Sequence, residues 1–155
     1  MDLVLATILE RLLQLIIYTG GTFDLFHSGH VNFLQQCSFY GEVVVALNTD
    51  EFIEEYKGST PVCSYSEREA VLLACKYVAD VVPNRGGADS KPAILDVCPD
   101  VIAIGSDWAR KDYHSQMGFN QDWLDQQNIS LLYIPYTSDI STTILKARLV
   151  DSNRV

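Results

Sequence analysis

Short, continuously apolar segments recur along this chain and alternate with longer amphipathic segments. The run Glu42–Leu47 reads Glu-Val-Val-Val-Ala-Leu, a pattern typical of a strand that is covered on both faces. The segments between such runs repeat apolar residues at helical spacing and begin with capping residues. This alternation predicts an α/β fold of the Rossmann-like kind, an open doubly wound parallel sheet with helices on both faces.

The expected elements follow one another without a repeat, a low-complexity tract or a linker. The expected strands cover residues 15–18, 42–47, 81–82, 101–104 and 131–134. The expected helices begin at Ser28, which is a suitable cap, cover 66–77, lie near 93, cover 120–127 and begin near 141. We therefore expect a single domain over residues 15–150. A helical extension is expected over 1–14 and a short tail over 151–155.

The charge balance limits the partners of this chain. It has 11 basic and 20 acidic residues among 155, a net charge of −9. Such a surface repels nucleic acid and anionic lipid, so a polyphosphate ligand would need a locally positive site. We expect neither a signal peptide nor a membrane span. The four cysteines form no Cys-x-x-Cys pair, which favours the reducing cytoplasm over a disulfide framework or a zinc knuckle.

A segment rich in glycine and histidine follows the first expected strand. It reads Gly20-Gly21-Thr22-Phe23-Asp24-Leu25-Phe26-His27-Ser28-Gly29-His30. The glycines let the backbone approach a ligand, and the helix start directs its amides and positive dipole end to the same place, as in a phosphate cradle. His27 and His30 can donate to phosphate oxygens. Donors there stabilise the charge that develops when pyrophosphate leaves an α-phosphorus.

Simpler interpretations of these residues stay open. Either histidine alone is compatible with a structural, hydrogen-bonded role. A zinc pair is conceivable, although the spacing provides no third ligand. Residues 48–51 read as a helix cap with an acidic first turn, Lys57 as a solvated charge, and Ser141 to Thr143 as caps or as a second anion site. The glycines, both histidines and the strand-to-helix junction together favour phosphate chemistry.

These motifs resemble those of the cytidylyltransferase-like nucleotidyltransferases, in which Gly-Thr-Phe-Asp and His-x-Gly-His follow the first strand. A Rossmann Gly-x-Gly-x-x-Gly is absent. The resemblance covers about residues 15–148 and is greatest, in size and in the segment 136–143, to the glycerol-3-phosphate branch. It implies transfer of CMP from CTP, with Mg²⁺, to a phosphorylated alcohol such as glycerol 3-phosphate, with release of pyrophosphate, by a homodimer. Open alternatives are ATP as donor, a sugar phosphate, phosphopantetheine or FMN as acceptor, and a degenerate nucleotide-binding module.

The resemblance also implies roles for individual residues. It gives catalytic roles to His27, His30 and Lys57. The nucleotide-binding residues that it implies are Gly21, Thr22, Phe23, Asp24, Gly29, Asp107, Trp108, Thr137, Ile140, Ser141, Thr142 and Thr143. The acceptor-binding residues that it implies are Asp24, Arg68, Lys76 and Lys111. The sequence departs from the family pattern where Tyr136 replaces an arginine, Asp139 a glycine, Lys76 an arginine and Ala79 an aspartate.

Overall fold

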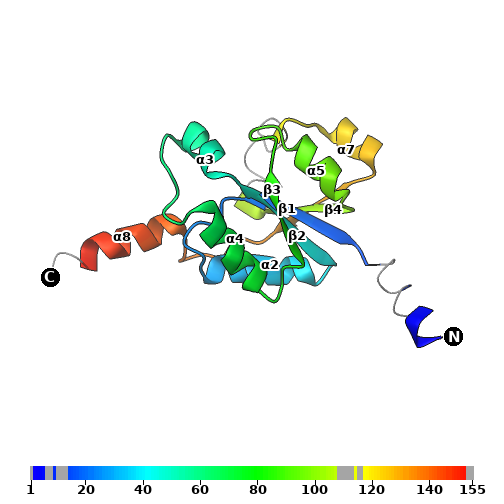
Figure 1. The fold of residues 1–155 in the computed structure, drawn as a ribbon, viewed down its shortest axis with the longest axis horizontal. Helices are drawn as coiled ribbons and strands as arrows, with labels where there is room; N and C mark the ends of the chain where they lie inside the picture. Colours follow the sequence, from blue (N-terminus) through cyan, green and yellow to red (C-terminus); the bar gives the residue numbers. More distant parts are fainter. Residues whose placement is uncertain (1, 6–8, 10–13, 108–113, 115–116, 153–155) are drawn as a thin grey trace.

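The structure is a computed structural model that describes residues 2–5, 9, 14–107, 114 and 117–152 (Figure 1). A parallel sheet of five strands, in the order β3-β2-β1-β4-β5, forms its centre. The strands are β1 Ile16–Gly21, β2 Glu42–Asn48, β3 Asp80–Asn84, β4 Val101–Gly105 and β5 Ser130–Ile134. The helices are α2 Ser28–Ser38, α3 Asp50–Lys57, α4 Tyr65–Ala74, α5 Lys91–Val97, α7 Gln121–Gln127 and α8 Thr142–Ser152. The predicted Rossmann-like α/β fold is confirmed.

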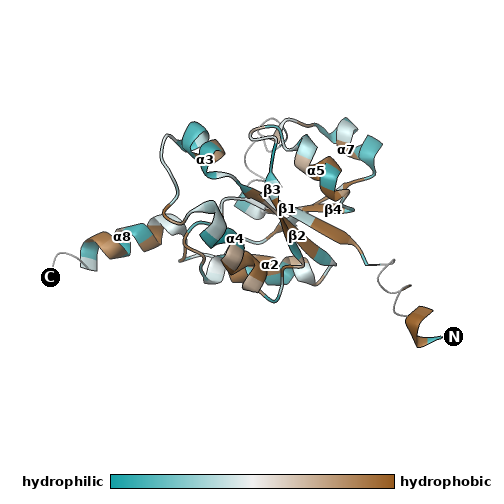
Figure 2. Cartoon of the chain, viewed as in Figure 1, coloured by the Kyte–Doolittle hydropathy of each residue, from teal (hydrophilic) through white to brown (hydrophobic). Residues whose placement is uncertain are grey.

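Helices cover both faces of the sheet, with α2 and α4 on one side and α5 and α7 on the other (Figure 1). Leu34 of α2 and Leu72 of α4 belong to one buried cluster, together with Val45 of the sheet. Ile94 of α5 and Leu124 of α7 belong to the second cluster, on the opposite face. The strands between them are strongly apolar, as Figure 2 shows. Burial on both faces explains why the strands read as continuous apolar runs rather than alternating ones.

The direction of chain crossover changes at β1. The chain adds β2 and β3 on one side of β1, then crosses to add β4 and β5 on the other side. Loops that leave the carboxyl ends of β1 and β4 therefore diverge, and ligands of open α/β sheets bind in the crevice that this divergence leaves. The fold therefore predicts a ligand site at the carboxyl ends of β1 and β4.

Three element boundaries differ from the sequence-based expectation. The strand β1 continues through both glycines, since Gly21 still pairs with Leu47 of β2. His27, rather than Ser28, caps α2, because the His27 imidazole accepts a backbone N–H and Ser28 is already helical. The helix α4 ends at Ala74 because Cys75 adopts extended dihedral angles. The helix-cap interpretation of residues 48–51 is confirmed, with Thr49 as the cap of α3.

The last described helix, α8, projects from one side of the domain (Figure 1). The helix α8 has no buried residue, and Leu149 and Val150 are each 58% exposed. It extends to Ser152, two residues beyond the expected domain boundary. Most of the expected helical extension over 1–14 lies outside the described residues. Residues 3–5 and 9, which are described, are helical. No helix in the described ranges has the length and apolarity to cross a membrane.

Candidate active site

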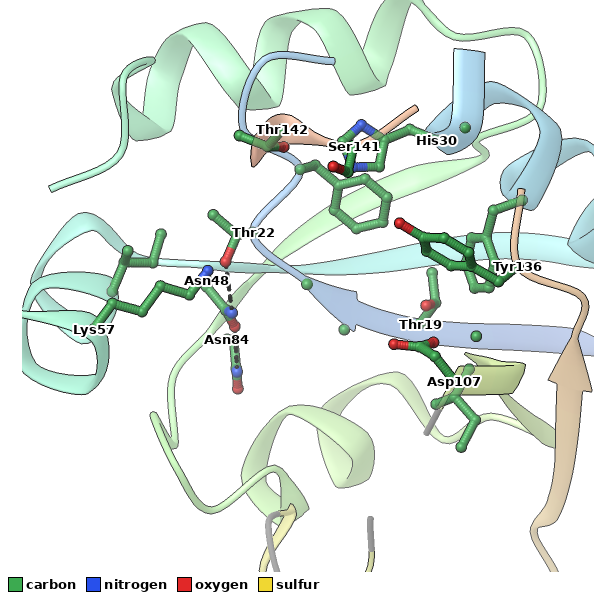
Figure 3. A pocket seen from close by; sticks show the side chains of 18 of the residues that line it. Thr19, Thr22, His30, Asn48, Lys57, Asn84, Asp107, Tyr136, Ser141 and Thr142 are labelled. Atoms are coloured by element: carbon green, nitrogen blue, oxygen red, sulfur yellow. Dashed lines mark hydrogen bonds between the residues drawn. The ribbon is translucent and has the colours of Figure 1, made fainter. Parts of the chain in front are cut away.

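A cavity of about 580 Å³ opens at the carboxyl ends of the strands (Figure 3). Each strand contributes a residue at or just after its end: Thr22, Asn48, Asn84, Gly105 and Tyr136. The start of α2, the face of α3 that carries Lys57 and the start of α8 complete the lining. The cavity therefore lies where the strand order reverses, as the topology requires.

Most of the sequence-predicted site residues meet at this cavity. Those that line it are Gly21, Thr22, Phe23, His27, Gly29, His30, Lys57, Asp107, Thr137, Ile140, Ser141, Thr142 and Thr143. Asp24, Arg68 and Lys76 are not among the residues that line it. Trp108 and Lys111 lie outside the described residues.

His27 and His30 form a stacked pair at the start of α2, with ring centroids 3.8 Å apart and planes 21° apart. Each Nδ1 accepts a backbone N–H: Nδ1 of His27 from Gly29 at 3.1 Å, and Nδ1 of His30 from His27 at 3.4 Å. A neutral imidazole that accepts at Nδ1 carries its proton at Nε2. The helix cap thus fixes the tautomer of both rings and leaves two Nε2–H donors at one wall of the cavity.

Both imidazoles are held neutral. Burial, followed by repulsion from His27, lowers the pKa of His30 to about 4, although the negative charge of Asp24 acts to raise it. Burial also lowers the pKa of His27 below its ordinary value. At neutral pH the pair supplies oriented N–H dipoles instead of full charges. Such dipoles stabilise charge as it develops without demanding a fixed counter-ion.

Gly29 keeps the space between the histidines and the last helix open. A Cβ atom at this position would lie 2.9 Å from Cε1 of His27 and 3.1 Å from Cγ2 of Ile140. Both distances are shorter than ordinary van der Waals contact. A glycine is therefore required for the ring of His27 to pack against the helix start.

The start of α8 lies beside the histidines, on the same wall of the cavity. Ser141 caps this helix, since its Oγ accepts the N–H of Ile144 at 3.1 Å. Oγ1 of Thr142 donates to the carbonyl of Asp24 at 2.9 Å, a contact between residues 118 positions apart. Figure 3 shows His30, Ser141 and Thr142 along one side of the cavity. Two helix starts therefore converge on this wall, and each favours an anion there.

Lys57 is the last residue of α3 and precedes Gly58, which ends the helix at φ 68°. Its backbone is thus helical rather than part of the loop suggested by the glycine. Among the described residues that line the cavity, Lys57 is the one lysine or arginine and Asp107 the one carboxylate. The positive site that the net charge of −9 demands is therefore small.

Asp24 does not line the cavity, and its carboxylate connects neighbouring segments of the chain. It is 6% exposed, and its carboxylate accepts the N–H groups of Val62 and Cys63, both at 2.9 Å, while Nζ of Lys146 lies 3.7 Å away. Burial acts to raise the pKa of Asp24, but the backbone donors and Lys146 outweigh it and lower the pKa below its ordinary value. The carboxylate therefore joins three segments of the site, whereas the resemblance implies a direct ligand contact.

Arg68 also differs in place from what the resemblance implies. It is 2% exposed, and its guanidinium donates to the carbonyls of Thr22, Asn48 and Cys63 and to Oδ1 of Asp50. Four acceptors nearly exhaust its five N–H groups. The guanidinium holds the ends of β1 and β2 together instead of facing an acceptor phosphate. It reaches these carbonyls because α4 packs under the sheet edge.

Lys76 does not reach the cavity. It follows α4 and precedes β3, so it lies toward the amino ends of the strands, whereas the cavity lies at their carboxyl ends. Its Nζ lies 5.0 Å from the ring centroid of Tyr77, in the geometry of a cation–π contact. Lys76 is thus next to a strand, as the sequence indicated, but at the amino end of that strand, away from the cavity.

Two departures from the family pattern have a structural counterpart. Asp139, where the family has a glycine, adopts φ 68°, the left-handed region in which aspartate is better tolerated than most residues. Tyr136, where the family has an arginine, lines the cavity and is 58% exposed. Asp139 thus adopts a conformation that a glycine adopts without strain, and an aromatic ring lines the cavity where the family pattern has an arginine.

Sequence reasoning missed a polar row on the β2–β3 side of the cavity. Asn48 and Asn84, the last residues of adjacent strands, pair in register, and both line the cavity. Asn48 was considered only within the segment 48–51, as part of a helix cap or, by the family resemblance, near the acceptor site, and Asn84 was not considered. The available signal was position: in a parallel sheet, polar residues that end adjacent strands lie at the same edge.

Fold and cavity together define an open α/β protein with a phosphate-binding type of site at its topological switch point. Residues 18–148 match the family model described as Cytidylyltransferase-like. The chain belongs to this cytidylyltransferase-like family of nucleotidyltransferases.

Curated relatives carry several activities. The chain is 35% identical over 134 residues to the glycerol-3-phosphate cytidylyltransferase of Bacillus subtilis, a match that covers 86% of this chain and 95% of that protein. It is 36% identical over 132 residues to an FAD synthase of Thermococcus sibiricus, covering 82% and 86%. It is 37% identical over 106 residues to the bifunctional protein HldE of Helicobacter pylori, covering 67% of this chain and 23% of that protein.

Solved structures share the fold. A lipopolysaccharide core biosynthesis protein from Thermoplasma volcanium superposes with a TM-score of 0.64 at 23% identity, covering 80% of this chain and 97% of that one. TmcAL of Thermotoga maritima, solved with alpha-thio ATP, superposes with a TM-score of 0.61 at 13% identity, covering 89% and 50%. At these identities the likeness concerns the fold alone.

Proposed function

We propose that this protein transfers CMP from CTP to glycerol 3-phosphate or a similar phosphorylated alcohol, giving a CDP-alcohol and pyrophosphate. The observation that carries the proposal is the pair of neutral imidazoles, His27 and His30, stacked at a helix start in the main cavity of a member of this family. The 35% identity to a glycerol-3-phosphate cytidylyltransferase, over 95% of that protein, supports this choice of substrates.

In the proposed reaction an oxygen of the acceptor phosphate attacks the α-phosphorus of CTP. A new P–O bond forms, the bond between the α-phosphorus and the bridging oxygen breaks, and pyrophosphate leaves with that oxygen and its electron pair. A phosphate monoester dianion is already a nucleophile, so the step needs no protein base. The Nε2–H groups of both histidines stabilise the charge on the non-bridging oxygens, and Lys57 with the start of α8 holds the β- and γ-phosphates.

Magnesium enters this scheme as part of the nucleotide substrate. Mg²⁺ prefers phosphate oxygens and water, with at most one or two carboxylates from the protein. Within the described ranges, no group of three or more His, Cys, Asp or Glu side chains is arranged to hold a metal. Asp107 is the one carboxylate among the described residues that line the cavity, and this is compatible with an ion that arrives with the triphosphate.

A second candidate is adenylyl transfer, with ATP as donor and FMN or a sugar phosphate as acceptor. It is favoured by Tyr136 in place of the family arginine and by the similarity to an FAD synthase. A pyrophosphate-release screen of four nucleoside triphosphates against glycerol 3-phosphate, sugar phosphates, phosphopantetheine and FMN decides between the two. We expect release with CTP and glycerol 3-phosphate. CTP binding without release from any pair would instead indicate a degenerate nucleotide-binding module.

We also propose a homodimer that works in the cytoplasm. Leu25, Phe26, Val71, Leu145 and Leu149 form a shallow, largely apolar surface between α4 and α8, which a second copy would cover. The four cysteines are unpaired thiols, as suits a reducing compartment. Light scattering on the purified chain should give twice the mass of 17.3 kDa, and Leu149→Glu should return the monomer. A monomer in the unaltered protein would refute the dimer.

A further inference from the structure

One exposed aromatic ring projects into the cavity beside the carboxyl ends of β4 and β5. Tyr136 lies just after β5, lines the cavity and is 58% exposed. Figure 3 shows its ring extending from the loop after β5 toward the middle of the cavity. Ligand pockets are commonly lined by aromatic side chains that bury part of the ligand. A ring that is this exposed inside the cavity can be reached by a ligand without any rearrangement of the core.

A hydrogen bond between neighbouring loops sets the position of this ring. The backbone N–H of Tyr136 donates to Oγ of Ser106 at 3.1 Å, and Ser106 directly follows β4. The two strands are paired up to this point, with Gly105 of β4 opposite Ile134 of β5. A tyrosine side chain has only two χ torsions, so a ligand that orders it loses little conformational entropy. Tyr136 is therefore a prepositioned flat surface at one end of the cavity.

The two ends of the cavity differ in charge. Figure 3 shows Lys57 at one end, and Tyr136 with the exposed carboxylate of Asp107 at the other. Phosphates are attracted to Lys57 and to the two helix starts, and they are repelled by Asp107. The end of the cavity that carries Tyr136 thus suits an uncharged, planar part of a nucleotide better than it suits phosphate.

We infer that Tyr136 forms the subsite for the base of the nucleotide donor, and that its ring stacks on that base. This inference rests on the proposed function and deepens it. With the α-phosphate at the two histidines and the β- and γ-phosphates at Lys57, the ribose and base lead away from Lys57, toward the ends of β4 and β5. Every base has a π-face, so the contact applies to the cytosine of CTP and equally to the adenine of ATP.

The first test separates the base from the phosphates by calorimetric titration. CTP, ATP and inorganic triphosphate, each with Mg²⁺, are titrated into the unaltered protein and into Tyr136→Leu, which keeps an apolar side chain but removes the ring. We expect the Kd of the nucleotide that the unaltered protein binds to rise about tenfold, and that of inorganic triphosphate to change less than about twofold. An equal loss for nucleotide and inorganic triphosphate, or no loss for either, would overturn the inference.

A second variant of the same residue separates stacking from a hydrogen bond of the hydroxyl group. Tyr136→Phe keeps the ring, so the Kd for CTP should stay within about threefold of that of the unaltered protein. A loss as large as that in Tyr136→Leu would mean that the hydroxyl makes the contact, and the stacking inference would be wrong.

The control is a tyrosine of nearly equal exposure at the other end of the same cavity. Tyr56 is 56% exposed, lines the cavity and precedes Lys57 on α3. Tyr56→Leu should leave the Kd for CTP within about twofold of that of the unaltered protein. A loss of CTP affinity in Tyr56→Leu, with none in Tyr136→Leu, would place the base beside α3 and overturn the inference.

A spectroscopic test needs no variant to bind the nucleotide. The ring-proton signals of Tyr136 are assigned by their absence from the spectrum of Tyr136→Phe. Addition of CTP to the unaltered protein should move these signals through the ring current of the base, and inorganic triphosphate should not. Signals that stay in place with CTP, or that move equally with both ligands, would contradict stacking.

Turnover distinguishes failure of this inference from failure of the proposed function. In Tyr136→Leu, KM for CTP should rise about tenfold, while kcat and KM for glycerol 3-phosphate stay nearly unchanged, because the contact is the same in the ground state and the transition state. Absence of pyrophosphate release from any substrate pair in the unaltered protein would refute the proposed function. The titrations would still decide whether Tyr136 contacts the base.

Discussion

At the scale of single residues, the histidine pair concentrates the chemistry of this protein. His27 and His30 each use one ring nitrogen to cap α2, and this leaves the other nitrogen as a donor at the cavity. The same hydrogen bonds that start the helix therefore orient the ring nitrogens that we propose contact the phosphates. Formation of the α2 start thus also positions the two histidine rings at the cavity.

Replacement of His30 with alanine should reduce turnover about 100-fold or more, because a donor to the developing charge is lost. Pyrophosphate release under saturating CTP and acceptor measures this effect. Circular dichroism and the midpoint of urea unfolding show whether the variant is folded. Turnover near that of the unaltered protein, in a folded variant, would remove His30 from the catalytic groups.

The lowered pKa of His30 makes stability depend on pH in a definite direction. Its pKa is about 4 in the folded protein and close to 6.5 in the unfolded chain. Between these values the unfolded chain binds a proton that the folded protein does not, so stability falls as the pH decreases from about 6.5 to about 4. The expected loss is about 1–3 kcal/mol. In urea titrations, His30→Gln should show a clearly shallower decline; an unchanged decline would assign it to other groups.

Gly29 provides a stricter test of the geometry of the pair. Gly29→Ala places a methyl group against the ring of His27 and the side chain of Ile140. We expect kcat to fall about tenfold or more as the ring is displaced, while the fold is kept. Steady-state kinetics measure this, and circular dichroism shows whether the variant keeps its fold. Normal kcat in Gly29→Ala would show that the ring position is not critical.

At the scale of elements, a buried arginine joins strand ends to the helix beneath them. Arg68 of α4 contacts the carbonyl groups that follow β1 and end β2, together with Asp50 at the start of α3. Asp24 performs a similar task for the loop at 62–63. The cavity walls are therefore held from behind by charged groups that do not face the ligand.

The position of Arg68 predicts a structural phenotype. Arg68→Met should lower the free energy of unfolding by about 2–4 kcal/mol, because three carbonyls and a carboxylate lose their donor. Urea unfolding measures this loss. Arg68→Lys should recover little of it, since an ammonium group cannot reach four acceptors in a fork. Unchanged stability, with a raised KM for the acceptor alone, would instead favour the direct phosphate contact that the family resemblance implies.

At the scale of the whole molecule, sequence periodicity determines the fold and the end of the sheet where the site lies. Buried strands such as Glu42–Asn48 are readable because a parallel sheet needs apolar residues on both faces. The place of His27 and His30 at the cavity could be predicted because they share a helix start with glycines. Arg68 and Lys76 were placed less well, since a charged residue near a motif does not reveal which end of its element faces the ligand. Asn84 was missed because its pairing depends on register across two strands.

Nucleotide binding should stabilise the whole domain. CTP with Mg²⁺ at about 100 times its dissociation constant should raise the free energy of unfolding by about 2.7 kcal/mol, because only the folded protein holds both helix starts in place. Hydrogen exchange should slow most at residues 21–30 and 137–143. Protection confined to other segments would place the triphosphate elsewhere.

The bond between Thr142 and Asp24 has a consequence for synthesis on the ribosome. It brings together residues 118 positions apart, so the wall that faces the triphosphate combines the beginning of the domain with its last helix. A nascent chain that has completed all five strands still lacks that wall until α8 has left the exit tunnel. If this wall binds the triphosphate as proposed, we expect nucleotide binding only after α8 has been synthesised, so translation products that lack this helix should not capture the nucleotide.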